Sequence, residues 1–234
     1  MRKVFIFQFF LCITIINGTM YAQDTNNQQT IEDLYLQSTI EVQVIATQAN
    51  QDSREMKMLA LNNIREMVDR GDVSGNSLDV IDVLRELGSE GTTKEVRLQG
   101  RLSNNYPMVR KESAKLLGDI GGEAARSNLI QMIRNDDEPT VISEAVYAIG
   151  KIGVDEKGIA FDVIAEALRK QNNTEPDNNL AFATLLAYEK IAEQQGGITD
   201  SNVYESIILI AQGNYVKDVK SKAVALLDKL RKMQ

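Results

Sequence analysis

The stretch PMVRKESAKLLGDIG, residues 107–121, has the features of one complete amphipathic helix. A proline is tolerated in the first turn of a helix, because the N–H that it lacks would have no partner there. The apolar residues that follow recur at three- and four-residue spacing, which places them on one helix face. The closing Gly121 is the residue type that most often ends a helix. The stretch therefore predicts a helix that buries one face.

The same pattern recurs four more times along the chain, at intervals of 32 to 39 residues. Each copy has a central apolar residue, with further apolar residues three positions before and after it, and most copies have a small residue four positions before it. Prolines precede three of the copies, and glycines follow four of them. Five copies with shared helix signals indicate a repeat architecture. The central residues are Leu84, Leu117, Ile149, Tyr188 and Leu227.

A second apolar segment with helical periodicity lies between successive copies, so each unit is predicted to be two antiparallel helices, with no sheet. The array of units is expected to cover residues 74–234. Before it, residues 30–73 are expected to form one divergent helix pair, at about 30–48 and 53–70. The segments predicted to be second helices are residues 93–104, 123–135, 158–170 and 199–212.

The units that begin at Pro107 and Pro139 resemble the HEAT repeat family, in particular its short type related to bilin-lyase HEAT-like repeats. The similarity rests on PMVR and AKLLGDIG in the first unit, and on PTV and AIGKIG in the second. It extends more loosely over about residues 74–234. The resemblance implies an all-α fold: an α-solenoid, or superhelix, of stacked antiparallel helix pairs of HEAT/armadillo-like type.

In this family, an aspartate before the first helix and an arginine after its valine often form a ladder of contacts along the stack. Arg110 and Lys220 keep the basic position, whereas Ile142 and Ala181 do not. The ladder is therefore expected to be incomplete and not to hold the stack together.

The N-terminus predicts an export signal. Arg2 and Lys3 precede the apolar stretch Val4–Ile16, and cleavage after Ala22 would make residues 1–22 a signal peptide. An uncleaved anchor is the alternative, although the stretch is shorter than the roughly 20 residues of a membrane-spanning helix.

The residues around this signal suggest where the protein resides. Residues 23–29 are polar and are expected to form a disordered leader. Lipidation of Cys12 is a further alternative, disfavoured by the bulky residues that precede it. The rest of the chain has no cysteine, which fits a soluble protein of the bacterial periplasm or envelope.

Composition excludes several kinds of chemistry. The chain has no histidine, so histidine acid–base catalysis and histidine-ligated metal sites are ruled out. A net charge of −7 argues against a nucleic-acid partner. The densest acidic group, residues 136–138, directly precedes Pro139, and we interpret it as helix capping rather than as a cation site. No enzyme activity, metal or cofactor is expected.

We expect a non-enzymatic protein–protein interaction scaffold or adaptor of the bacterial envelope, which binds a protein partner through the curved face of the solenoid. The alternatives are a structural component of an envelope machine fixed by its ends and an accessory, lyase-like enzyme subunit. In the family, second helices line the inner face. Partner-binding residues are therefore expected there: Arg97 and Arg101 on one side of one second helix, and Gln131 and Arg134 at corresponding positions on the next.

The helix expected at residues 216–233 is the fifth copy of the pattern and is rich in lysine and arginine. Two interpretations stay open. The helix is either a polar cap over the last apolar layer, or a basic surface that docks on an acidic partner or peripherally on an anionic membrane.

Overall fold

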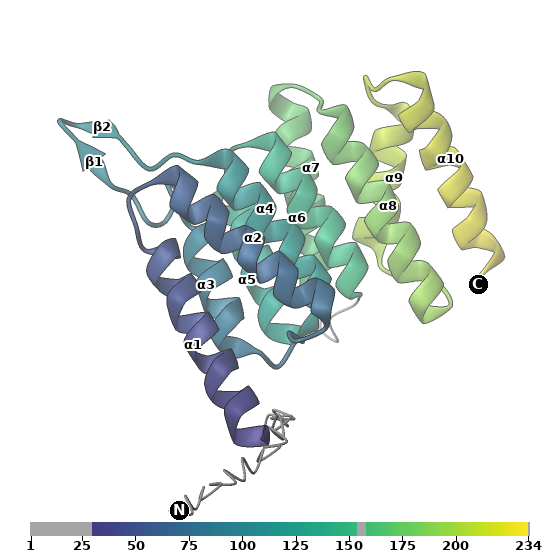
Figure 1. Ribbon diagram of the computed structural model, residues 1–234. Helices are drawn as coiled ribbons and strands as arrows, with labels where there is room; N and C mark the ends of the chain where they lie inside the picture. The colour runs from purple at the N-terminus through teal and green to yellow at the C-terminus, as the bar shows by residue number, and fades with distance from the viewer. Residues whose placement is uncertain (1–29, 154–157, 234) are drawn as a thin grey trace, which may run out of the picture.

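The computed structural model describes residues 30–153 and 158–233, which form ten helices and one short hairpin (Figure 1). This confirms the predicted all-α solenoid. No helix among these residues is long and apolar enough to cross a membrane. The predicted signal peptide and leader, residues 1–29, lie outside the described residues. The elements are α1 (Ile31–Ala49), α2 (Arg54–Arg70), α3 (Leu78–Gly88), β1 (Arg97–Leu98), β2 (Arg101–Leu102), α4 (Pro107–Ile120), α5 (Gly122–Asn135), α6 (Pro139–Ile152), α7 (Ile159–Thr174), α8 (Asn178–Gln195), α9 (Ser201–Gln212) and α10 (Lys217–Lys232).

The boundaries of the central helices follow from their prolines and glycines. Helices α4 and α6 begin at Pro107 and Pro139, as predicted. They end before Gly121 and Gly153, whose φ angles are 75° and 92°. A residue with a side chain rarely adopts such angles, so glycine ends both helices at little cost in free energy.

The helices are arranged in two layers (Figure 1). Helices α2, α4, α6, α8 and α10 pack in that order in the first layer, and α1, α3, α5, α7 and α9 pack in that order in the second. The core lies between the layers, and the central repeat residues Leu117, Ile149 and Tyr188 are completely buried there. The predicted repeat pattern thus marks the face that the first layer turns toward the second.

Small residues allow the first-layer helices to approach closely. A Cβ atom added at Gly118 on α4 would lie 2.6 Å from the Cβ of Ala148 on α6. One added at Gly150 on α6 would lie 2.5 Å from the Cα of Ala187 on α8. Since real Cβ atoms do not approach other atoms so closely, only glycine fits at these two crossings.

The structure corrects one copy of the predicted repeat. Helix α3, which carries Leu84, belongs to the second layer, where it packs against α1 and α5. The first-layer helix of this unit is α2, whose buried Leu61, Ile64 and Met67 have the spacing of the repeat. Ile64 lies 53 residues before Leu117. That interval is longer than the others because a hairpin is inserted between α3 and α4.

This hairpin replaces the second helix predicted at residues 93–104, and the expectation of no sheet is wrong here. Strands β1 and β2 pair antiparallel across a two-residue turn. The turn residues Gln99 and Gly100 have φ angles of 51° and 80°, the left-handed pair that matches the twist of a tight hairpin. Val96 and Leu98 alternate with charged residues, a strand period rather than a helix period. The other three predicted second helices are present as α5, α7 and α9.

Candidate functional site

Two buried ion pairs connect the end of a second-layer helix to a first-layer helix. Arg110 on α4 binds Asp136, the residue after α5, through two contacts (Nε to Oδ2, 2.6 Å; Nη2 to Oδ1, 3.1 Å). Lys57 on α2 binds Glu90, just after α3, with 2.9 Å between Nζ and Oε1. All four side chains are at most 3% exposed. Each pair therefore joins the two helices of one unit deep in the protein.

The two pairs are equivalent rungs of the ladder expected from the family. Lys57 also donates to the carbonyl of Ala49 at the end of α1 (2.8 Å), and Arg110 donates to the carbonyl of Glu90 after α3 (2.9 Å). Helices α6 and α8 have apolar residues at the basic position, so the ladder is incomplete, as expected. The expectation that it does not hold the stack together is wrong for the N-terminal half, where each base also reaches the preceding unit.

Glu90 fixes the base of the hairpin. Its Oε2 accepts a hydrogen bond from Asn104 Nδ2 (2.9 Å), and its Oε1 lies 3.0 Å from Lys94 Nζ. Asn104 Oδ1 in turn accepts the N–H of Val96 (2.8 Å). Burial would raise the pKa of Glu90, but hydrogen bonds from Asn104, Lys57 and Lys94 outweigh it and hold the pKa below its ordinary value. The charged carboxylate thus ties both ends of the inserted loop to α2.

The tip of the hairpin projects from the solenoid (Figure 1). Leu98 is 65% exposed, and Arg97 pairs with Glu95 at 2.8 Å. Arg101 is exposed and makes no ion pair with any described residue. Arg97 stands opposite Leu102, and Leu98 stands opposite Arg101. Because opposite residues share a face, the two arginines lie on opposite faces, each beside a leucine. The expectation that they share one side of a helix is wrong.

Gln131 is exposed on α5, as predicted, and lines a groove of about 350 Å³ that we call the α3–α5 groove. The groove lies between α5, the end of α3 and the loop that leads to the hairpin. Thr92 and Lys94 line it from the loop, and Asn128 lines it from α5. Gln131 therefore lies beside the loop that leads to the hairpin base. The sequence predicted a second helix at this position instead of a loop.

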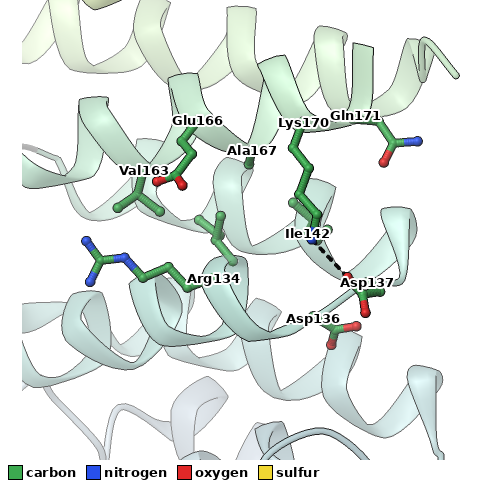
Figure 2. Close-up of a pocket in the computed structure, with 10 residues that line it drawn as sticks. Arg134, Asp136, Asp137, Ile142, Val163, Glu166, Ala167, Lys170 and Gln171 are labelled. Carbon is green, nitrogen blue, oxygen red and sulfur yellow. Dashed lines mark hydrogen bonds and ion pairs between the residues drawn. The ribbon is translucent and has the colours of Figure 1, made fainter. Parts of the chain in front are cut away.

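Arg134 is also exposed on α5 and borders a smaller pocket of about 90 Å³ between α5, α6 and α7, the α5–α7 pocket (Figure 2). Ile142 and Val163 are part of its apolar lining. Lys170 and Asp137 border it with an ion pair of 3.0 Å, and Arg134 extends away from this pair (Figure 2). A pocket of this size has room for several water molecules or for one apolar side chain of another protein.

The helix capping expected of residues 136–138 is wrong, because Glu138 occupies the N-cap position of α6 and its side chain makes no capping hydrogen bond. Asp136 binds Arg110, and its Oδ1 accepts the N–H of Glu138 at the start of α6 (2.9 Å). The carboxylate of Asp137 forms an ion pair with Lys170, with 3.0 Å between Oδ1 and Nζ. No group of three or more acidic, histidine or cysteine residues in the described part of the chain is arranged to hold a metal ion.

Three important residues of this region are not singled out by the sequence pattern above: Lys57, Glu90 and Leu98. Lys57 stands seven positions before Ile64, as Arg110 stands seven before Leu117, so an alignment of α2 would reveal it. Leu98 is indicated by the glycine-containing turn that follows it. Glu90 has no local signal, because its role depends on α2, far away in the sequence.

Comparison with known families supports this architecture. Residues 95–178, from the hairpin to the start of α8, match the family model for HEAT repeats. No match is found among curated proteins. The described helices and this match agree with the resemblance given by the sequence.

Proposed function

Because this chain contains HEAT repeats, which commonly mediate protein–protein interaction, we propose that it is a non-enzymatic scaffold or adaptor that binds a protein partner. Repeats of this kind host many functions, so the argument depends on the surface of this particular chain. We place the protein in the bacterial periplasm or envelope, after export and cleavage near Ala22. The charged start and short apolar stretch of residues 1–22 support this placement.

The observation that carries the proposal is the firmly anchored, exposed hairpin. Its base is held by the buried carboxylate of Glu90, whereas Leu98 at its tip is 65% exposed. An apolar side chain on a pre-organised support loses little conformational entropy when it enters a partner, which favours binding. Arg97 and Arg101 flank it, and arginine is enriched in protein interfaces.

The proposed partner surface consists of Arg97, Leu98, Arg101, Gln131 and Arg134. Gln131 extends it from the hairpin along the α3–α5 groove, and Arg134 extends it to the α5–α7 pocket. Three arginines without a buried acidic partner favour an acidic protein surface. Leu98 and the α5–α7 pocket favour a partner that offers an apolar pocket and an apolar side chain.

A capture experiment with envelope extract tests this surface. The bait is the tagged protein, and mass spectrometry identifies what it retains. The triple charge reversal Arg97→Glu, Arg101→Glu and Arg134→Glu should lose the specific partner without changing the melting temperature. The matched control reverses three other exposed basic residues and should retain it. The control variant is Arg54→Glu, Lys115→Glu and Arg169→Glu. Equal capture by both triple variants would contradict this surface.

The placement in the envelope has its own test. The intact mass of the protein purified from its native cells should correspond to a chain that begins at Gln23. A mass that retains residues 1–22, or that includes a lipid on Cys12, would contradict cleavage near Ala22.

A further inference from the structure

Each buried rung of the ladder follows one rule. A basic side chain on a first-layer helix binds an acidic residue that follows the second-layer helix of the same unit. Lys57 with Glu90 and Arg110 with Asp136 obey this rule at 2.9 and 2.6 Å. The second-layer helix must end beside the base for this contact to form.

Lys220 occupies the basic position of this rule but has no acidic partner. It follows the buried Val219 on α10, as Arg110 follows the buried Val109 on α4. Its side chain is partly buried and makes no ion pair with the described residues. Among them, no second-layer helix packs beyond α10 to supply the acid.

Asp52 occupies the acidic position and has no basic partner. It follows α1, a second-layer helix, as Asp136 follows α5. Asp52 is exposed, and its backbone carbonyl accepts a hydrogen bond from the Tyr106 hydroxyl (3.2 Å). The carboxylate makes no contact with a basic side chain in the described part of the chain. The two incomplete rungs therefore lie at opposite ends of the described solenoid.

The helices that carry or precede the two incomplete rungs both have exposed apolar side chains. On α10, Val224 is 52% exposed, although its equivalents Ala114 and Val146 on α4 and α6 are completely buried. On α1, Ile40 and Val44 are 59% and 50% exposed. Each end thus presents apolar side chains that a continued stack would cover.

The surfaces at these two ends are complementary in charge. Helix α10 has six lysines and arginines against two aspartates, and two of the six, Lys222 and Lys229, pair with Glu189 and Glu193 on α8. Helix α1 has no basic residue, and its Glu41 pairs with Arg70 on α2 at 2.9 Å, so the acidic residue free at this end, among the described side chains, is Asp52. Opposite charges on two surfaces favour their association and fix their relative orientation.

We propose that the protein associates head to tail with a second copy of itself, so that Lys220 on α10 binds Asp52 of the second copy. The order of layers supports this arrangement. Helices α9 and α10 are a second-layer and a first-layer helix, and α1 and α2 of the next copy continue the same alternation. Because the two surfaces differ, this interface is heterologous, and it produces a ring or an open filament rather than a closed symmetric dimer. The inference does not depend on the proposed function, since neither residue belongs to the proposed partner surface.

Sedimentation velocity of the purified full chain over a concentration series tests the proposal. The sedimentation coefficient of the wild-type protein should rise with protein concentration, and added salt should weaken the association. Lys220→Glu and Asp52→Lys should each weaken it about tenfold or more, because each places like charges at the interface. The matched control Lys115→Glu makes the same charge change on the exposed surface of α4 and should associate like wild type.

Mixing the two single variants gives the sharpest result. Glu at position 220 of one variant then meets Lys at position 52 of the other, and the unchanged Lys220 meets the unchanged Asp52. The mixture should therefore regain the association that each variant lacks alone. A defect inside the monomer would not be repaired by mixing.

Three outcomes would overturn the proposal: a wild-type protein that stays monomeric at all concentrations, single variants that associate like wild type, or a mixture that associates no better than its components. Melting temperatures of both variants should stay close to wild type, because neither side chain has an ionic partner within the described monomer. If a charge reversal lowers the melting temperature, Lys220→Met and Asp52→Asn provide the same comparison without the added charge.

Discussion

Asp136 and Asp137 are neighbours in sequence, but their ion pairs should contribute very differently to the free energy of unfolding. Asp136 is 2% exposed and binds Arg110 through both carboxylate oxygens. Asp137 is 90% exposed and pairs with Lys170, which is 69% exposed. Substitution of each by alanine therefore compares a buried with a solvated ion pair at the same turn of the chain.

Asp136→Ala leaves the guanidinium of Arg110 buried without its carboxylate. Removal of one partner from a buried pair costs about 3–5 kcal/mol. Arg110 keeps hydrogen bonds to the carbonyl of Glu90 and to Asn105 Oδ1, both at 2.9 Å, which places the expected loss at the lower end, about 3 kcal/mol. Asp137→Ala should change the free energy of unfolding little, because exposed ion pairs contribute little.

Urea denaturation followed by far-ultraviolet circular dichroism measures both variants. The double variant Arg110→Met, Asp136→Leu should be more stable than Asp136→Ala, because it leaves no buried charge behind. Equal losses for Asp136→Ala and Asp137→Ala would refute the assignment of Asp136 to a buried rung. So would a double variant less stable than Asp136→Ala.

Three further predictions concern the hairpin and the helix crossings. The pKa of Glu90 lies below its ordinary value of 4.5, so its stabilisation is fully present above that value and is lost as the pH falls through the folded-state pKa. Glu90→Gln should therefore flatten the acid limb of a plot of unfolding free energy against pH, and an unchanged slope would contradict this. Gly150→Val should lower the unfolding free energy by about 1–3 kcal/mol in the same denaturation assay, because its Cβ would meet the backbone of Ala187. A variant as stable as wild type would show that α6 and α8 lie farther apart. Gly100→Val should accelerate tryptic cleavage at Arg101, because valine rarely adopts the φ of 80° that the turn requires. The melting temperature should change little, because no atom lies within 4 Å of the added Cβ. An unchanged cleavage rate would argue against the tight turn.

The helices and their boundaries could be predicted from the sequence because their signals are local. Pro107 and Gly121 mark the two ends of α4, and the apolar spacing around Leu117 shows that one face is buried. The same signals locate α6 and most of the helices after it. Gln131 and Arg134 are exposed on α5, as predicted, because the polar side of an amphipathic helix faces solvent whichever helix packs on the other side.

The hairpin shows where local signals conflict. Residues 93–104 contain apolar residues at spacings that fit a helix or a strand, and the repeat favoured a helix. Backbone geometry decided otherwise: Gln99 and Gly100 form a left-handed turn, and Glu90 holds the loop ends in place. Arg97 and Arg101 therefore lie on opposite faces of a hairpin, although both are exposed as expected.

By itself, the sequence determined that this protein is a stack of amphipathic helices built from repeated units, because helix periodicity and helix ends are encoded within a few turns. Only the tertiary structure decided the layer of each helix, since an apolar face shows that a helix is buried and not what covers it. Leu84 fits the repeat spacing, yet α3 lies in the second layer. The first-layer helix that takes the place predicted for α3 is α2. The rungs between Lys57 and Glu90 and between Arg110 and Asp136 also join residues far apart in the chain, and only folding brings their charges together.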